Sequence, residues 1–322
     1  MNRRLAIIAA SLTLAAASAG AQPYPVKPIR LIVPFATGGG SDTVSRAISD
    51  RLSKALGQPL VIENRPGAGG SLGADLVAKS PADGYTMLVT DASAVTINPS
   101  LYPKLPYAAK DLTPVINLAT FTLVLITPAK SPINSVAEFI NADKAKPGGL
   151  SGASPGSGSS PHLMLEMMNS LAGTRLVHVP YKGGGPALTD VVGGQVDFSF
   201  NGLSSGAMSM IQAGKVKALA VTAGSRAPSL PQVPTLSESG FPGLDVISAQ
   251  SLLVPAGTPQ EIVVRLNAEI SKILEMPEMK SRWSGAGFLP QQSQTPAQVA
   301  AWFAQESQKW GKLIKEKNIT AD

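Results

Sequence analysis

The sequence predicts an α/β protein built from two discontinuous lobes. Short β-rich runs alternate with amphipathic helical segments, a pattern typical of parallel α/β sheets. Two longer extended runs, 115–126 and 246–255, stand where the chain would leave one lobe and return to it. The 322 residues, 44% of them hydrophobic, suffice for two packed lobes and exclude global disorder. We expect lobe 1 to comprise residues 22–121 and 250–322, and lobe 2 residues 122–249.

The N-terminal segment has the features of a secretory signal peptide. Two arginines precede an apolar run at residues 5–19, and the small residues Ala19, Gly20 and Ala21 follow. This run is shorter than the ~20 apolar residues of a membrane span. We therefore expect residues 1–21 to direct export to the periplasm, with cleavage near Ala21 or after Ala19; the alternative is a retained anchor. Removing the two arginines lowers the net charge from +6 to +4.

Composition excludes several kinds of site. The chain has no cysteine, which rules out a disulfide framework, a thiolate metal site and a cysteine nucleophile. Only two histidines are present, so most histidine-built zinc sites are also excluded, and we expect neither a metal nor a cofactor. Lysines and arginines are scattered singly, without a basic run or interleaved aromatic residues. The sequence therefore does not indicate a nucleic-acid partner.

The first lobe opens with a predicted βαβαβ unit. Its first helix is expected to be capped by Ser41 and Asp42, because apolar residues then recur at helical spacing until Gly57. The expected elements, in order, are a buried strand at 29–34, this helix, a strand at 60–63, a helix through Ala78 and a strand at 86–90.

The second lobe repeats the alternation. Ser135 and Glu138 form a capping-box pattern that predicts a short helix, and Ser160 begins another. Strands are expected at residues 149–153, 175–180, 196–200 and 217–222. After the return to lobe 1, Thr258-Pro259 and Thr295-Pro296 each precede an amphipathic helix and are expected to cap it.

A glycine-rich loop, residues 34–42 (PFATGGGSD), joins the first strand to the first helix. Three successive glycines let backbone N–H groups converge, and the helix start adds unpaired donors and partial positive charge. Such a turn can hold a carboxylate or phosphate without a cationic side chain. It matches neither a Walker loop nor the G-x-G-x-x-G fingerprint. The alternative is a plain turn with Asp42 as the N-cap.

A second loop, residues 152–161 (GASPGSGSSP), also leads from a strand into a helix, but in the other lobe. In an open parallel sheet, the loops after the carboxyl ends of strands line the ligand crevice. Two such loops facing each other would grip the two ends of a small dianion. The alternative interpretation is a flexible linker, because Gly/Ser runs often serve as linkers.

The second loop also contains an enzyme motif. Residues 152–156 (GASPG) match the G-x-S-x-G nucleophile elbow. However, the elbow needs an N–H donor after the serine, and Pro155 has none. Glu166 is the only acid between Ser154 and His178, and it falls in a predicted helix. A secreted serine esterase using Ser154 is therefore the weaker alternative.

The two histidines have ordinary structural interpretations. His162 and Glu166 stand at i and i+4 on one helix, but two ligands are too few for a metal site. We therefore expect His162 to be a hydrogen-bonded residue near the cleft. His178 lies in an apolar strand and is expected to be a core or edge residue.

Several motifs occur in a specific order along nearly the whole chain after the signal. They are VPFATGGGSD at 33–42, VIENRPGAGG at 61–70, ADGYT at 82–86, NPSLY at 98–102, SSPHL at 159–163, VPYKGGGPA at 179–187, GQVD at 194–197, VPTL at 233–236 and PAGTP at 255–259. In this order and spacing the sequence resembles the periplasmic substrate-binding receptors of tripartite tricarboxylate transporters, the TctC or Bug family.

The resemblance implies a two-domain periplasmic-binding-protein fold, type II-like. Each lobe would be a doubly wound sheet flanked by helices, with two crossing strands, an interdomain ligand cleft and no catalysis. The implied ligand is a small carboxylate, a di- or tricarboxylate or an aromatic carboxylate, delivered to the membrane transporter subunits of the tripartite tricarboxylate type. A ligand-sensing receptor without transport is the alternative. We expect a monomer without a cofactor.

The resemblance also implies a set of binding residues. One carboxylate would be held mainly by main-chain amides of the first loop, at Thr37, Gly38, Gly39, Gly40, Ser41 and Asp42, with Phe35 beside them. The opposing residues would be Ser154, Gly156, Ser157, Ser159, His162, Tyr181 and Lys182, with Ser93 and Asn201 from other loops. Many family members carry proline or alanine before the glycine pair. The third glycine and Ser41 depart from the pattern, so the identity of the ligand does not transfer.

Overall fold

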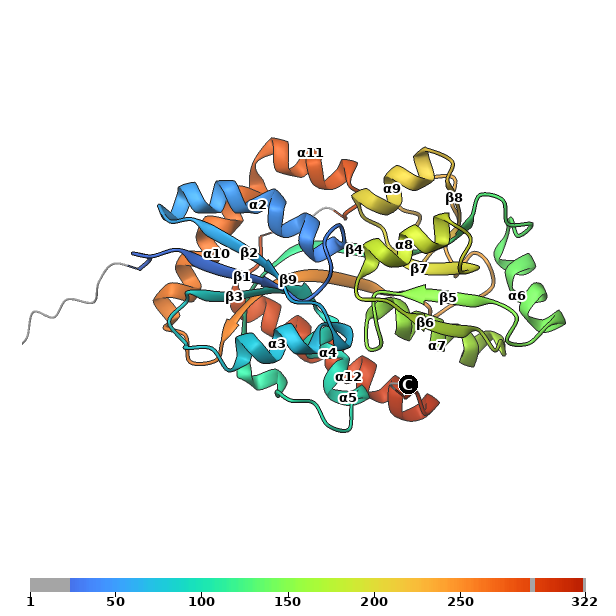
Figure 1. Cartoon of the computed structure of the whole chain (residues 1–322), viewed down its shortest axis with the longest axis horizontal. Helices are drawn as coiled ribbons and strands as arrows, with labels where there is room; N and C mark the ends of the chain where they lie inside the picture. The colour runs from blue at the N-terminus through green and yellow to red at the C-terminus, as the bar shows by residue number, and fades with distance from the viewer. Residues whose placement is uncertain (1–23, 290–292, 321–322) are drawn as a thin grey trace, which may run out of the picture.

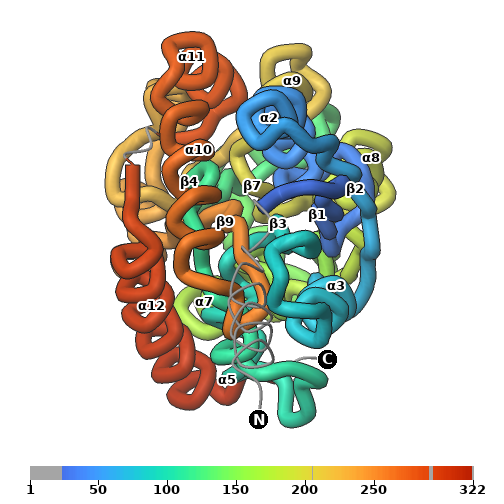
Figure 2. The backbone as a smooth tube through the Cα atoms, turned by 90° about the vertical axis from the view of Figure 1, so that its left-hand side faces the viewer, coloured from blue at the N-terminus to red at the C-terminus, as the bar shows by residue number. Residues whose placement is uncertain are grey.

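A computed structural model describes residues 24–289 and 293–320 of the chain (Figure 1). The predicted signal peptide, residues 1–21, lies outside the described residues. A sheet of nine strands in the described ranges extends through both lobes in the order β2-β1-β3-β9-β4-β7-β5-β6, with β8 paired to β4. Helices cover the two faces of this sheet (Figures 1 and 2).

The βαβαβ unit predicted for lobe 1 is present. Strands β1 (Ile29–Val33), β2 (Leu60–Asn64) and β3 (Thr86–Asp91) are parallel, and α2 (Gly40–Leu56) and α3 (Ser71–Ala78) connect them. A short 3-10 turn, η2 (Ala68–Gly70), precedes α3. Because the strands are parallel, the loops that follow β1, β2 and β3 gather at one edge of the sheet. This edge faces lobe 2.

Strand β4 (Leu112–Pro128) belongs to both lobes. Its first part pairs antiparallel with β9 (Ile247–Pro255), and its second part, from Leu123, pairs with β7 and β8. The other neighbour of β9 is β3, also antiparallel. Hence β4 carries the chain across the junction, and β9 returns it to lobe 1 alongside β4. These strands correspond to the two predicted extended runs.

Lobe 2 contains a second parallel unit. In it, β5 lies between β6 and β7 and is parallel to both. The elements of this lobe are α6 (Val136–Ala145), β5 (Ser151–Ser154), α7 (Ser160–Ala172), β6 (Val177–Pro180), α8 (Gly184–Val192), β7 (Phe198–Gly202), α9 (Ser205–Gln212) and β8 (Val216–Val221). Phe139 and Phe198 are fully buried and pack edge to face, with 4.9 Å between their ring centroids. They anchor α6 to the sheet.

The C-terminal helices complete lobe 1. They are α10 (Gln260–Glu275), α11 (Pro277–Gly285) and α12 (Pro296–Lys317). Three short helices lie earlier in the chain, between β3 and β4: α4 (Ser93–Thr96), α5 (Asn98–Leu101) and η3 (Ala109–Asp111). Figure 2 shows α2, α10 and α11 on one side of the lobe 1 sheet and α3, α5 and α12 on the other. Among the described helices, none is both long enough and apolar enough to cross a bilayer.

The start of α2 differs from the predicted cap. The N-cap is Gly39, so Ser41 and Asp42 lie in the first turn of the helix. The Asp42 carboxylate instead reaches back and accepts a hydrogen bond from the Gly38 N–H at 3.0 Å. The extended backbone of Gly39 starts the helix two residues before Ser41, the first of the predicted caps. The N–H groups of the first turn have no acceptor within the helix.

The later helix starts are only partly as predicted. Ser135 caps α6 by accepting a hydrogen bond from the Glu138 N–H. Thr258 does not cap α10, because its hydroxyl donates to the Pro255 carbonyl, and Pro259 is the N-cap. Thr295 caps α12 as predicted. It forms a capping box with Gln298, as the Gln298 N–H donates to Thr295 Oγ1 and the Thr295 N–H donates to Gln298 Oε1.

The Thr295 capping box is testable by mutation. We expect Thr295→Ala to lower the melting temperature by about 2–4 °C, because loss of an N-cap costs about 1 kcal/mol. Thr295→Ser keeps the hydroxyl and is the control, which should melt within a degree or so of the wild type. Thermal unfolding followed by circular dichroism measures both. Equal melting temperatures for the alanine and serine variants would contradict a stabilising cap.

Candidate ligand-binding cleft

A cavity lies where the two lobes meet, and the space between its walls, counted together with the open solvent at its mouth, is about 650 Å³. Its lining combines the loop after β1, the ends of β3 and β7, and the starts of four helices. The residues are Phe35, Gly38, Gly39, Gly40, Ser41, Asp91, Phe121, Pro155, Ser159, Pro161, Gly184, Leu188, Asn201, Gly202, Ser204, Gly206, Gln250 and Phe288.

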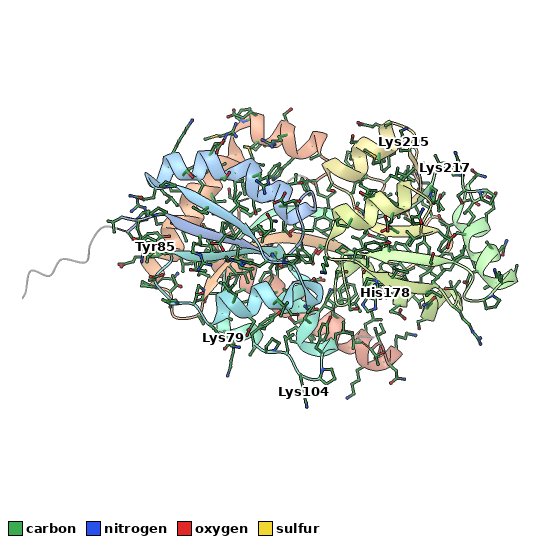
Figure 3. The ribbon with its side chains drawn as sticks, viewed as in Figure 1. Lys79, Tyr85, Lys104, His178, Lys215 and Lys217 are labelled. Atoms are coloured by element: carbon green, nitrogen blue, oxygen red, sulfur yellow. The ribbon has the colours of Figure 1, made fainter. Side chains whose placement is uncertain are left out.

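The positive potential of the cavity comes from the backbone. Helices α2, α7, α8 and α9 all begin at its wall, the first from lobe 1 and the others from lobe 2. A helix N-terminus presents unpaired N–H groups and about half a positive charge. The described lining contains no lysine, arginine or histidine. Lys79, Lys104, Lys215 and Lys217 lie at the outer surfaces of the lobes, away from the junction (Figure 3).

The first glycine-rich loop contributes its backbone rather than its polar side chains. The cavity is lined by Gly38, Gly39, Gly40 and Ser41. These are residues whose backbone amides we expect, from the sequence, to bind an anion. The Ser41 hydroxyl donates to Oε1 of Gln250 on β9. This hydrogen bond fixes the first turn of α2 against the sheet.

Asp42 faces away from the cavity. Its carboxylate accepts hydrogen bonds from the Gly38 N–H, from Arg46 Nε and from Asn64 Nδ2, each at 3.0 Å. Burial raises the pKa of Asp42, but these hydrogen bonds outweigh burial and hold it below the usual range. Asp42 is therefore an anionic strut that shapes the loop.

The second loop presents Pro155, Ser159 and Pro161 to the cavity. Ser154 and His162 lie beneath the loop, both buried and outside the cavity lining. His162 accepts a hydrogen bond from the Gly158 N–H through Nδ1. These two side chains hold the loop from below.

The motif residue Ser154 has a histidine neighbour. Its Oγ lies 2.6 Å from His178 Nε2 and accepts a hydrogen bond from the Gly156 N–H. His178 lies on β6, the edge strand of lobe 2 (Figure 3). Its ring stacks on that of His162 with 4.1 Å between the centroids. Ser154 is only 1% exposed and does not reach the cavity, so its hydroxyl has no access to a substrate there.

The remaining predicted residues lie where the lobes touch beside the cavity. Gly156, Ser157, Tyr181 and Lys182 line a neighbouring hollow together with the turn at 67–70. The Ala36 N–H donates to the Lys182 carbonyl at 2.9 Å, and the Tyr102 hydroxyl donates to the Ser157 carbonyl at 2.7 Å. These hydrogen bonds join the loops of opposite lobes.

Tyr181 also has a supporting position, as do Ser93 and Thr37. The Tyr181 hydroxyl donates to Asp190 at 2.6 Å, and burial together with this carboxylate raises the pKa of Tyr181 to about 12. Ser93 is buried behind Asp91 and donates its N–H to that carboxylate. Thr37 lies outside the cavity lining, with its carbonyl close to Gly185.

Sequence reasoning missed several lining residues, most notably Asp91 and Gln250. Asp91 ends β3, and a polar residue at the carboxyl end of a parallel strand was the available signal. Gln250 lies in the predicted return strand, where a polar side chain in a buried run was a second signal. The aromatic walls Phe121 and Phe288 had no local signal, because only the tertiary fold brings them to the cavity.

The comparisons identify the family. The protein-family model TctC, described as "Tripartite tricarboxylate transporter family receptor", matches residues 44–319 of the sequence. The chain belongs to this family. The protein BugT of Bordetella pertussis is 36% identical over 320 residues, covering 98% of each chain. This membership confirms the resemblance seen in the sequence, and TctC proteins are transport receptors rather than enzymes.

Solved structures confirm the periplasmic-binding-protein fold. MatC from Rhodopseudomonas palustris with bound malate is 35% identical, with a TM-score of 0.87, over 90% of this chain and 100% of that chain. A second R. palustris structure, Rpa4515 with adipate, is 33% identical, with a TM-score of 0.88, over 92% of this chain and 99% of that one. The two-lobed architecture is therefore that of solute receptors.

The contact between the lobes at Gly69 is testable. Gly69 has a positive φ of 59°, and a Cβ added there would lie 1.8 Å from the Ser157 carbonyl oxygen of lobe 2. We expect Gly69→Ala to hold the lobes apart and to enlarge the radius of gyration measured by small-angle X-ray scattering. Gly173→Ala is the matched control, because Gly173 has φ 65° but no atom within 4 Å of the added Cβ. Identical scattering from both variants would contradict the interlobe contact.

Proposed function

We propose that this TctC-family protein is a periplasmic solute receptor that captures a small carboxylate between its lobes and delivers it to the membrane subunits of a tripartite tricarboxylate-type transporter. One observation carries the proposal. Four helix N-termini from two lobes meet at one cavity whose described lining has no cationic side chain. Such a site attracts an anion through oriented backbone dipoles. The malate and adipate bound to the two relatives are both dicarboxylates, which supports the same class here.

In the proposed binding mode, one carboxylate lies at the start of α2 against the amides of residues 39–41, because the Gly38 N–H already donates to Asp42. The opposite end of the ligand faces lobe 2, where Asn201 and Ser204 line the cavity near the start of α9. Asn201 is 5% exposed, and its Nδ2 has no hydrogen-bond partner among the residues that the structure describes. A buried donor without an acceptor costs free energy, so a ligand oxygen at this position would stabilise the bound state.

The predicted binding set then divides into two groups. We assign direct contact to Phe35, Gly38, Gly39, Gly40, Ser41, Ser159 and Asn201, which line the cavity. The others would shape the loops or join the lobes: Thr37, Asp42, Ser93, Ser154, Gly156, Ser157, His162 and Tyr181. Because amides and hydroxyls replace a buried salt bridge, binding avoids the full desolvation cost of a fixed cation.

Ligand capture would couple to closure of the lobes. A ligand that touches both walls favours the arrangement in which the loops are in contact, since only differential affinity can shift a conformational equilibrium. The two lobes, 22–121 with 250–322 and 122–249, would rotate about the β4 and β9 segments near the junction. The receptor would act as a monomer, exported by the signal at residues 1–21.

The proposal predicts selective stabilisation by carboxylates. Thermal unfolding of the mature protein against a panel of mono-, di- and tricarboxylates, amino acids and aromatic acids should show one chemically coherent group of shifts. A ligand at a hundredfold excess over its Kd stabilises the folded state by about 2.7 kcal/mol. Sugars, polyamines and inorganic phosphate serve as controls. Stabilisation by a control class and by no carboxylate would contradict the proposal.

The role of the first loop is tested at Gly39. An added Cβ there would lie 3.5 Å from the Gly184 N atom, an ordinary contact, so Gly39→Ala should fit. A leucine would extend into the space between the starts of α2 and α8. We therefore expect Gly39→Leu to weaken binding of the panel's best ligand at least tenfold, and Gly39→Ala far less, as measured by calorimetry. Unchanged affinity in the leucine variant would exclude the loop from the site.

A further inference from the structure

Asp91 is a buried acid in the wall of the cavity. It ends β3, is 7% exposed and is the only ionisable side chain in the described lining. Its carboxylate accepts a hydrogen bond from the Ser93 N–H at 2.9 Å. It also accepts from the hydroxyls of Ser160 of lobe 2, at 3.2 Å, and Ser248 of β9, at 3.1 Å.

Asp91 has no positively charged hydrogen-bond partner among the described residues. Its hydrogen-bond donors in the described structure are neutral groups. Burial opposes the ionised form and raises the pKa of Asp91, while these hydrogen bonds act in the opposite direction. A carboxylate ligand in the same cavity adds a second negative charge close by, which disfavours ionisation of both groups. A ligand that also carries a positive charge would remove this conflict.

The cavity offers complementary positions for such a ligand. Donors are provided by the backbone N–H groups of residues 39–41 and by Nδ2 of the buried Asn201, which has no hydrogen-bond partner among the described residues. Asp91 provides a charged acceptor on another part of the wall. The Gln250 amide does not neutralise this charge, because its Oε1 is occupied by the Ser41 hydroxyl and the side chain is neutral. The lining therefore matches a molecule that is anionic at one end and carries an ammonium nearby.

We propose that Asp91 determines specificity by pairing with an ammonium group, so that the receptor prefers amino carboxylates over carboxylates of the same length that lack the amino group. This inference rests on the proposed carboxylate function and narrows it. Asp91 would contact the ligand directly, while Ser93, Ser160 and Ser248 hold its carboxylate in place. A ligand hydroxyl would donate a hydrogen bond to the same atoms but would not compensate the charge.

Isothermal titration calorimetry with matched ligands tests the proposal. L-aspartate, malate and succinate share a four-carbon dicarboxylate skeleton and differ only in an ammonium, a hydroxyl or a hydrogen; L-glutamate and glutarate form a second pair. We expect the amino member of at least one series to bind at least tenfold more tightly than the unsubstituted member, about 1.4 kcal/mol. Asp91→Asn should remove this preference, mainly by weakening the amino ligand at least tenfold.

A second buried aspartate provides the control. Asp143 is 1% exposed, accepts a hydrogen bond from the Arg175 N–H and does not line the cavity. Asp143→Asn should therefore keep the wild-type order of affinities. If the loss of any buried carboxylate changed that order through the structure alone, Asp143→Asn would change it too. Thermal unfolding of both variants checks that each of them folds.

Three outcomes would overturn the inference. If succinate and glutarate each bind wild-type protein as tightly as their amino counterparts, the carboxylate function stands and the role of Asp91 is wrong. If the Asp91→Asn protein keeps the preference for the amino ligand, another group binds the ammonium and the role of Asp91 is wrong. If no member of either series binds, nor any other carboxylate, the proposed function itself fails together with the inference.

Discussion

The convergence of helix N-termini on one point is the constraint on which the rest of the molecule depends. Each helix that meets the cavity follows a β-strand or a short loop from one, so its first N–H groups point toward the junction. These groups need acceptors that the protein does not supply within the helices. The topology therefore builds an anion site from the direction of the chain, and the described lining needs no cationic side chain.

Close packing of backbone against backbone makes this convergence possible. At Gly69 the two lobes approach so closely that a Cβ would overlap the Ser157 carbonyl. At Gly40 the backbone meets a side chain instead, and a Cβ would lie 3.2 Å from Nε2 of Gln250. The glycine-rich loops thus serve two purposes, since they expose amides and let the lobes meet. Strand β4 connects the lobes, because its first part pairs with β9 and its second part with β7, and this places the loops opposite each other.

The order of strands and helices could be predicted from the sequence because it depends on local periodicity. The two extended runs also stood out, since β4 and β9 are buried along most of their length. Side-chain direction could not be predicted in the same way. Ser154 and His162 turn beneath their loop to satisfy its backbone, and Asp42 turns to Arg46 and Asn64. Those partners come from the tertiary fold. Asp91 was missed for the same reason, because its serine partners belong to two distant segments.

Charge recognition by backbone dipoles is most directly tested by calorimetric titration of the mature protein with a ligand found by screening and with its analogue in which one carboxylate is replaced by a carboxamide. The two molecules have nearly the same shape and differ by one negative charge. Recognition by the N–H groups at the start of α2 predicts that the carboxamide of the bound carboxylate loses at least tenfold in affinity. Equal affinities for the acid and every such amide would contradict an anion site at the junction of the lobes.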